Sequence, residues 1–200
     1  YNIGGWKALR SVGIRHVLKS DPRTNDLDSR SDYLRSHIRY LNNMRNITVA
    51  EIGVWEGNHA RILQEQLDID EIYLIDPYDA YEDYEENKSE VEKMRDAEQE
   101  AHKKLKRYDN TEWIKEYSHV ASEQIDTELD YVYVDGNHKY EYVKRDIEEY
   151  YKKLKPGGVI AGHDFCLSWT GVIEAVTELS EQKEIEYHIE NYGSDWYMKK

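Results

Sequence analysis

The chain of 200 residues has one cysteine, three prolines and one phenylalanine. The lone Cys166 excludes an internal disulfide framework and fits a reducing compartment. No apolar run approaches the roughly 20 residues that a helix needs to cross a bilayer, and no signal peptide is visible. We therefore expect a cytoplasmic protein with no membrane partner.

Basic residues are also scarce, with 27 lysines and arginines against 41 acidic residues and a formal net charge of −14. Because phosphate binding needs a basic face, this balance argues against a nucleic-acid partner. The hydrophobic fraction of 39% is low but globular, since 18 tyrosines contribute to the core. The length suffices for one domain of ordinary size.

Short apolar stretches typical of strands alternate with longer amphipathic stretches typical of helices. The expected strands cover residues 47–52, 72–75, 113–116, 131–134, 159–161, 185–190 and 195–198. The expected helices cover residues 6–18, 31–42, 58–67, 84–107, 121–125, the segment between 136 and 155, and 171–179. This alternation predicts a three-layer α/β fold, with an antiparallel hairpin that turns at residues 191–193 and closes a mostly parallel sheet. Residues 1–45 would form an N-terminal arm with helices, and residues 46–200 the main domain.

The segment Leu129–Phe165 is the most informative. Two of its apolar runs end in polar residues, and the residues of interest are Asp135, His138, His163 and Asp164. Strands joined by a long crossover lie parallel, so both runs would end at the same edge of the sheet. That edge is where open parallel sheets bind ligands. Four titratable side chains there indicate chemistry more than structure.

A glycine-containing loop follows the first expected strand, with the pattern E-x-G-x-x-x-G at Glu51, Gly53 and Gly57. Glycines permit positive φ angles and a close approach of the backbone to a ligand. The loop lacks the G-x-G-x-x-G spacing of a dinucleotide site, and Glu51 would repel a pyrophosphate. An acid at this place suits a ligand with positive charge, such as an ammonium or a sulfonium. The alternative is an ordinary turn between strand and helix.

Asp76 directly follows the second expected strand. A carboxylate at that position can accept hydrogen bonds from both hydroxyls of a ribose, and it lies about 20 residues beyond the glycine loop, as in nucleotide-binding sheets. The alternative is a turn aspartate that precedes Pro77.

The cluster at the sheet edge suggests two kinds of chemistry. Asp135, His163 and Asp164 offer an oxygen-rich cation site of the kind that Mg²⁺ uses. His138 has an ordinary pKa of about 6.5 and can take a proton from a hydroxyl near neutral pH. The structural alternatives are a helix cap for Asp135, a surface position for His138, and a turn for His163 and Asp164.

Taken together, these motifs, with I-D-P-Y, D-G-x-H-x-Y and L-K-P-G-G-x-I-x-x-H-D, resemble class I S-adenosylmethionine-dependent methyltransferases. More narrowly, they resemble the O-methyltransferases that include the macrocin and catechol enzymes and cephalosporin hydroxylase-like proteins. The resemblance runs from Ile47 to the C-terminus. It implies a Rossmann-like sheet of seven strands in the order 3-2-1-4-5-7-6, with strand 7 antiparallel.

The resemblance also implies roles for individual residues. The cofactor-binding set is Glu51, Gly53 and Gly57 for the methionine end, Asp76 and Tyr78 for the ribose, Tyr117, Ser118 and His119 for the adenine, and Asp135. His138 matches the general base. Asp135 and Asp164 match metal ligands. His163 stands where metal-dependent relatives have an acid. Because imidazole prefers transition metals, this histidine argues against Mg²⁺ as the cofactor and leaves a site for Mn²⁺ or a site without metal open.

We therefore expect a methyltransferase that uses S-adenosylmethionine and methylates a hydroxyl of a small molecule or a sugar, with a divalent metal as a candidate helper. One alternative is a non-catalytic module that keeps the cofactor pocket. A less favoured one is an NAD-dependent oxidoreductase, because the dinucleotide motif is missing. The N-terminal arm is a candidate contact in a homo-oligomer.

Overall fold

The computed structural model describes residues 36–79, 88–190 and 194–200. The expected helix at residues 6–18, most of the N-terminal arm and the hairpin turn at residues 191–193 lie outside these ranges. The helix expected at residues 31–42 appears within them as α2, Ser36–Leu41.

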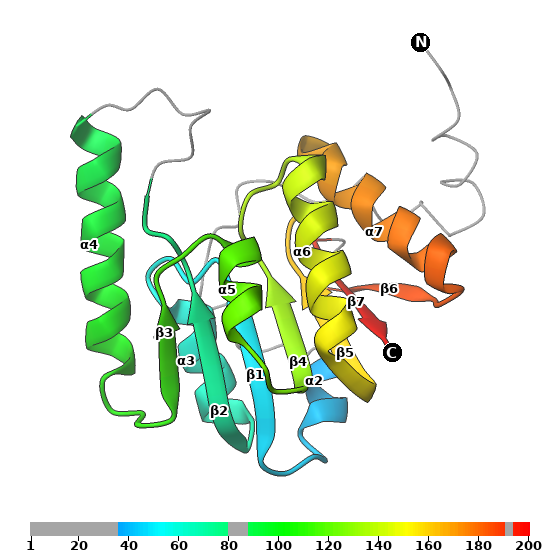
Figure 1. Cartoon of the computed structure of the whole chain (residues 1–200), viewed down its shortest axis with the longest axis horizontal. Helices are drawn as coiled ribbons and strands as arrows, with labels where there is room; N and C mark the ends of the chain where they lie inside the picture. The colour runs from blue at the N-terminus through cyan, green and yellow to red at the C-terminus, as the bar shows by residue number, and fades with distance from the viewer. Residues whose placement is uncertain (1–35, 80–87, 191–193) are drawn as a thin grey trace.

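A seven-stranded sheet forms the centre of the molecule, in the order β3-β2-β1-β4-β5-β7-β6 (Figure 1). The strands are β1 (Ile47–Ile52), β2 (Ile69–Ile75), β3 (Thr111–Ile114), β4 (Leu129–Val134), β5 (Leu154–Gly162), β6 (Tyr187–Glu190) and β7 (Asp195–Lys199). The first five strands pair in parallel, and β7 pairs antiparallel with both β5 and β6. The predicted fold class and strand order are confirmed.

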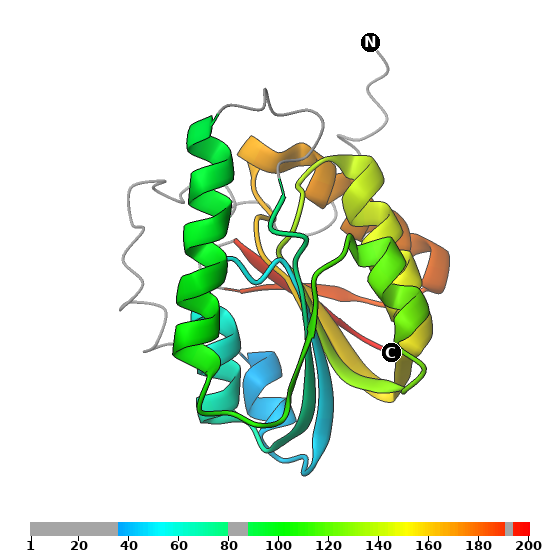
Figure 2. The same ribbon diagram turned by 60° about the vertical axis from the view of Figure 1, so that its left-hand side comes forward.

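Helices cover both faces of the sheet. After α2 they are α3 (Asn58–Gln66), α4 (Lys88–Leu105), α5 (Ser118–Gln124), α6 (Tyr140–Lys153) and α7 (Thr170–Lys183), with a short 3-10 helix η3 (Leu167–Trp169) before α7. The buried side chains of α2, α3 and α4 belong to one hydrophobic cluster, and those of α5, α6 and α7 to another. Figure 2 shows these two groups of helices on opposite sides of the twisted sheet.

The central strands feed both clusters because successive side chains of a strand point to opposite faces. In β4, Val132 and Val134 belong to the cluster beneath α5 to α7, whereas Tyr131 and Tyr133 belong to the other. Every residue of β1 and β4 is buried. This burial is why their sequences are almost continuously apolar and why they hold the residues at their ends firmly in place.

The bounds of several elements differ from the sequence-based expectation. β3 occupies Thr111–Ile114 instead of residues 113–116. Asn110, the residue before it, fixes the start of the pairing with β2. Its side-chain amide donates to the Ile69 carbonyl at 2.9 Å, and its backbone carbonyl accepts from the backbone N–H of Ile72. β5 begins at Leu154, since the stretch 155–158 that was expected to separate helix and strand is itself extended. Among the described residues, no helix combines the length and apolarity that a membrane span requires.

Candidate active site

A cavity of about 640 Å³ opens at the carboxyl ends of the central parallel strands. Eight of the residues singled out in the sequence line it: Glu51, Gly53, Asp76, Ser118, Asp135, His138, His163 and Asp164. They come from the ends of β1, β2, β4 and β5 and from the start of α5. The parallel topology therefore gathers most of the expected site in one place.

The glycine loop passes very close to the end of β4. Gly53 has φ +85°, and a Cβ built on it would lie 2.1 Å from the carbonyl oxygen of Asp135. Gly57 has φ +71° and directly precedes α3, where a Cβ would meet Ala101 at 3.1 Å. Both positions require glycine, the first because of the close backbone contact and both because of the left-handed conformation.

Asp76 anchors this loop. Its carboxylate accepts backbone N–H groups from Val54 at 3.0 Å, Trp55 at 2.9 Å and Tyr78 at 2.8 Å. Burial raises the pKa of Asp76, and these hydrogen bonds oppose the rise without cancelling it. Because each carboxylate oxygen can accept more than one bond, the group still has acceptor capacity for a ligand in the cavity.

Glu51 lies at the base of the cavity with a side chain that is almost fully buried. Its Oε2 is 3.1 Å from Nδ1 of His59, a cavity residue on the first turn of α3. The His59 ring stacks on Tyr133 with 3.7 Å between the ring centroids. A buried acid next to an imidazole is a suitable partner for a positively charged group.

Four residues of the expected cofactor set lie outside the lining of the cavity: Gly57, Tyr78, Tyr117 and His119. Tyr78 is buried, and its hydroxyl donates to the carbonyl of Trp55 at 2.9 Å, so it stabilises the glycine loop. Tyr117 and His119 flank Ser118 at the start of α5, with their ring centroids 6.2 Å apart. Their roles in cofactor binding stay predictions.

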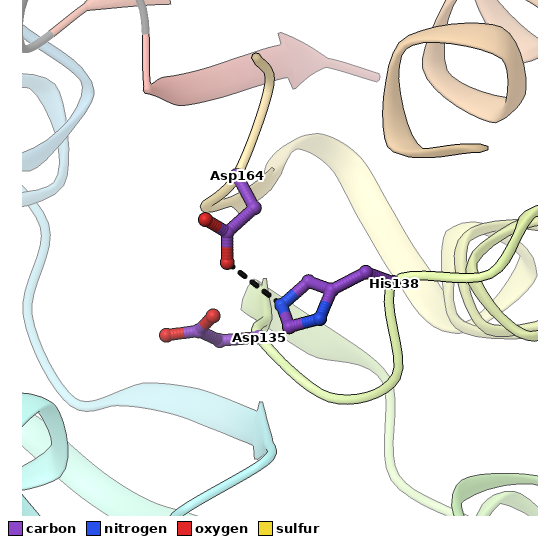
Figure 3. Close-up of side chains that lie close together, drawn as sticks. All are labelled: Asp135, His138 and Asp164. Carbon is purple, nitrogen blue, oxygen red and sulfur yellow. Dashed lines mark ion pairs between the residues drawn. The ribbon is translucent and has the colours of Figure 1, made fainter. Parts of the chain in front are cut away.

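Asp135, His138 and Asp164 lie close together beyond the carboxyl ends of β4 and β5 (Figure 3). His138 Nε2 lies 2.7 Å from Asp164 Oδ2, and one potential ligand atom from each of the three residues lies within 4.8 Å of the others. Asp135 directly follows β4, His138 sits in the loop before α6, and Asp164 follows β5 with φ 61°. Two carboxylates and an imidazole at these separations can hold a divalent metal ion.

Hydrogen bonds determine the charge of Asp164. Burial alone would raise the pKa of this carboxyl, but its hydrogen bonds with His138 and His163 outweigh burial and hold the pKa well below its usual range. Asp164 is therefore an anion at any physiological pH. The contact of 2.7 Å with this anion orients the ring of His138.

His163 lines the cavity but lies behind the group of three. Its Nδ1 is 3.1 Å from Asp164 Oδ2, and its Nε2 is 3.6 Å from Asp195 Oδ1. Burial lowers the pKa of His163, whereas the hydrogen bond to Asp164 and the negative charges of Asp135 and Asp195 raise it by more. Both ring nitrogens thus face carboxylates, and the metal role expected for His163 stays a prediction.

The aromatic ring of Trp169 stacks on His138, with 4.3 Å between centroids and an interplanar angle of 25°. Trp169 belongs to η3 and is 42% exposed. A Cβ at Gly171 would lie 2.7 Å from the carbonyl oxygen of His138, which shows how closely α7 approaches this loop. The ring of His138 is therefore held between Asp164 and Trp169.

Two residues of this region were not singled out in the sequence. Asp195, at the start of β7, is fully buried beside His163. Asp146, on α6, is 3% exposed, and its Oδ1 lies 2.5 Å from the hydroxyl of Ser118. Asp146 has a helical spacing with Val143 and Tyr150 that could have identified it as an inward-facing acid.

Residues 50–165 match a family model described as a methyltransferase domain. An uncharacterised protein of Acanthamoeba polyphaga mimivirus is 27% identical over 140 residues, which cover 64% of this chain and 59% of that relative. The chain thus spans less than two thirds of the length of that relative.

Solved structures with the same fold include an rRNA methylase from Streptococcus thermophilus, with a TM-score of 0.61 and 16% identity over 84% of this chain and 95% of the other. The O-methyltransferase TomG of Streptomyces achromogenes, solved in complex with SAM, has a TM-score of 0.58 and 16% identity over 96% of this chain and 85% of the other. The family match covers more than half of the chain and includes the glycine loop, Asp76 and all residues of the central cluster. The chain therefore belongs to the methyltransferase domain family.

Proposed function

We propose that this protein transfers the methyl group of S-adenosylmethionine to a hydroxyl of a small molecule, with His138 as the general base. The observation that carries the proposal is the contact of 2.7 Å between His138 Nε2 and Asp164 Oδ2, in the same cavity as the glycine loop and Asp76. A basic group held by a permanent anion beside a cofactor pocket is what proton removal from an acceptor requires.

The cofactor would lie along the ends of β1 and β2. In this proposal the buried carboxylate of Glu51 faces the ammonium of the methionine part, Asp76 accepts the ribose hydroxyls, and Ser118 borders the adenine. Each of these residues lines the cavity. The negative charge of Glu51 and Asp135 would favour the positive sulfonium compound over its neutral-sulfur product.

Methyl transfer then needs alignment and removal of one proton. The acceptor oxygen attacks the methyl carbon in line with the carbon–sulfur bond, and the bonding electrons leave with sulfur. If Nε2–H of His138 donates to Asp164, its Nδ1 is the basic nitrogen that receives the proton of the hydroxyl. Asp164 stabilises the imidazolium that results, because its own pKa is held low by the two histidines.

A divalent metal fits the same cluster. Asp135, His138 and Asp164 would hold it, and two oxygens with one imidazole nitrogen suit Mn²⁺ better than Mg²⁺. When bound, such an ion would acidify the acceptor hydroxyl. The two uses of His138 compete, because a neutral imidazole has only one nitrogen with a free lone pair. If Nε2 ligates a metal, Nδ1 carries the hydrogen and cannot take the proton of the acceptor.

The acceptor is expected to be small and neutral or cationic. The net charge of −14 disfavours anionic acceptors and nucleic acids. The partly exposed side chain of Trp169, next to His138, is a candidate stacking surface for a sugar or an aromatic ring.

Two measurements test the proposal. Calorimetry with S-adenosylhomocysteine should show binding at one site per chain, and transfer of labelled methyl from S-adenosylmethionine should be detected with members of a panel of hydroxylated acceptors. Addition of EDTA, followed by Mn²⁺ or Mg²⁺, separates the two roles of His138, because a base mechanism survives chelation and a metal mechanism does not. Absence of cofactor binding would reject the proposal.

A further inference from the structure

A buried carboxyl lies directly behind one wall of the cavity and has no part in the proposed transfer of the methyl group. Asp146, on α6, is 3% exposed, and its Oδ1 lies 2.5 Å from Oγ of Ser118. Ser118 begins α5 and lines the cavity. The carboxyl therefore reaches the cavity through the hydroxyl of Ser118.

The backbone of Ser118 is held separately. The hydroxyl of Tyr150 donates to the Ser118 carbonyl at 2.9 Å, and Ser122 contributes a second link between α5 and α6 through its contact of 3.2 Å with Glu149. The attachment of α5 to α6 thus has supports other than Asp146. The contact that Asp146 itself makes with α5 is the one with the Ser118 hydroxyl.

The direction of the Ser118 O–H decides whether the serine can act as a donor or only as an acceptor toward the cavity. A serine hydroxyl has one donor and two acceptor sites, and an ionised carboxylate can only accept. When Asp146 is ionised, the Ser118 O–H must point at it, and the oxygen offers lone pairs to the cavity. When Asp146 is protonated, the acid can donate to Ser118, which frees the Ser118 O–H to donate into the cavity.

Both the protonated and the ionised form of Asp146 are accessible near neutral pH. Burial raises the pKa of Asp146 to about 7, the hydrogen bond from Ser118 and the positive charge of Arg145 oppose the rise, and the charge of Glu149 adds to it. Tyr150 also faces the carboxyl, since the charge of Asp146 contributes to the raised pKa of that phenol. Arg145, Glu149 and Tyr150 belong to α6, and Ser118 is the group that faces Asp146 from α5.

We propose that Asp146 is a positioning residue that sets whether Ser118 offers a donor or an acceptor to the adenine ring of the cofactor. The inference rests on the proposed function, which places the adenine beside Ser118. Adenine has acceptor ring nitrogens and a donor amino group, so only one of the two orientations of the Ser118 hydroxyl is complementary to the edge that it meets. The protonation state of a residue that never touches the ligand would thereby tune affinity for it.

The test is calorimetric titration with S-adenosylhomocysteine and with adenosine, from about pH 6 to about pH 8.5, a range that spans the ionisation of such a carboxyl. Adenosine lacks the amino-acid part, so its affinity does not report on Glu51 or on the cluster around His138. The variants are Asp146→Asn, which cannot ionise, and Ser118→Ala, which lacks the hydroxyl. Glu148→Gln removes a neighbouring acid of α6 that is not among the groups that shift the pKa of Asp146.

For the wild type and Glu148→Gln, we expect the dissociation constant for adenosine to change about three- to tenfold across this range, as expected for one hydrogen bond gained or lost. Asp146→Asn and Ser118→Ala should both show a constant affinity. A wild-type affinity that is independent of pH, or an Asp146→Asn profile that follows the wild type, would overturn the inference. If the wild type gives either of these results but binds S-adenosylhomocysteine, only the inference about Asp146 fails and the proposed function is unaffected. If the wild type binds neither S-adenosylhomocysteine nor adenosine, the proposed function and the inference both fail.

Discussion

Asp164 Oδ2 lies 2.7 Å from His138 Nε2, although the two residues follow different strands of the sheet. The contact exists because β4 and β5 run parallel and end at the same edge, where Val134 pairs with Gly162. Asp135 and His138 follow β4 and Asp164 follows β5, so the three side chains lie next to one another at this edge (Figure 3). The role of His138 as general base depends on this contact.

Gly53→Ala should strongly destabilise the fold. The added Cβ would meet the Asp135 carbonyl oxygen at 2.1 Å, and a backbone atom at the end of a buried strand cannot move aside. We expect a loss of at least about 3 kcal/mol in the free energy of unfolding, as for other backbone clashes in a core. Urea denaturation followed by circular dichroism measures it.

Gly157→Ala is the matched control, because Gly157 also has a left-handed φ of +84° but its added Cβ would come no closer than 3.6 Å to Tyr40 Oη. It should lose only about 1–2 kcal/mol, the cost of the left-handed conformation. Equal losses for the two glycines would contradict the close contact between the loop and β4.

Asp76→Ala should weaken the binding of S-adenosylhomocysteine by about 10- to 100-fold, because charged hydrogen bonds of this kind contribute about 1.5–3 kcal/mol each. The substitution removes the expected ribose acceptor and also the anchor of the backbone N–H groups of Val54 and Trp55. Asp70→Ala changes an exposed aspartate of the same strand and should leave the affinity unchanged. Calorimetry that finds equal affinities for both variants would remove Asp76 from the cofactor site.

Much of the fold followed from the sequence because apolar periodicity and turn residues mark the central elements clearly. β1 and β4 were expected almost at their observed bounds, since a strand that is buried on both faces is mostly apolar. The end strands were less certain. β3 has a burial pattern that mixes exposed and buried residues, so neighbouring contacts such as that of Asn110 determine where it begins.

The site could be predicted where chain topology alone brings residues together, as for Asp135 and Asp164 at the ends of adjacent strands. The contact between His163 and Asp195 could not be predicted in this way. It joins β5 to the first residue of β7, and the register of that antiparallel pair depends on packing between distant segments. Asp146 was overlooked for a different reason, because it stands among the charged residues of a helix whose exposed face shares the same composition.

The stability of the protein should depend on pH through Asp146. The pKa of an aspartate is about 3.9 in an unfolded chain, and burial raises the pKa of Asp146 to about 7 in the fold. Between these values the folded chain keeps a proton that the unfolded chain has lost. The contribution of Asp146 to stability is therefore complete in acid and is lost as the pH rises through 7.

Asp146→Asn removes this dependence. From about pH 5 to about pH 8, the wild type should lose on the order of 2 kcal/mol more stability than the Asn variant, by linkage of proton binding to folding. Urea denaturation of both proteins at the two pH values measures the difference. Identical losses in both proteins would mean that the buried carboxyl keeps an ordinary pKa.

The role of His138 as general base is tested most directly by the rate of labelled methyl transfer to the best acceptor of the panel, compared between His138→Ala and His188→Ala. His188 is an exposed histidine of β6 that stacks on Tyr197, away from the cavity, and serves as the control. We expect His138→Ala to reduce turnover at least about 100-fold, as loss of a general base does, with unchanged affinity for S-adenosylhomocysteine. Turnover of His138→Ala close to that of the wild type and of His188→Ala would contradict the account.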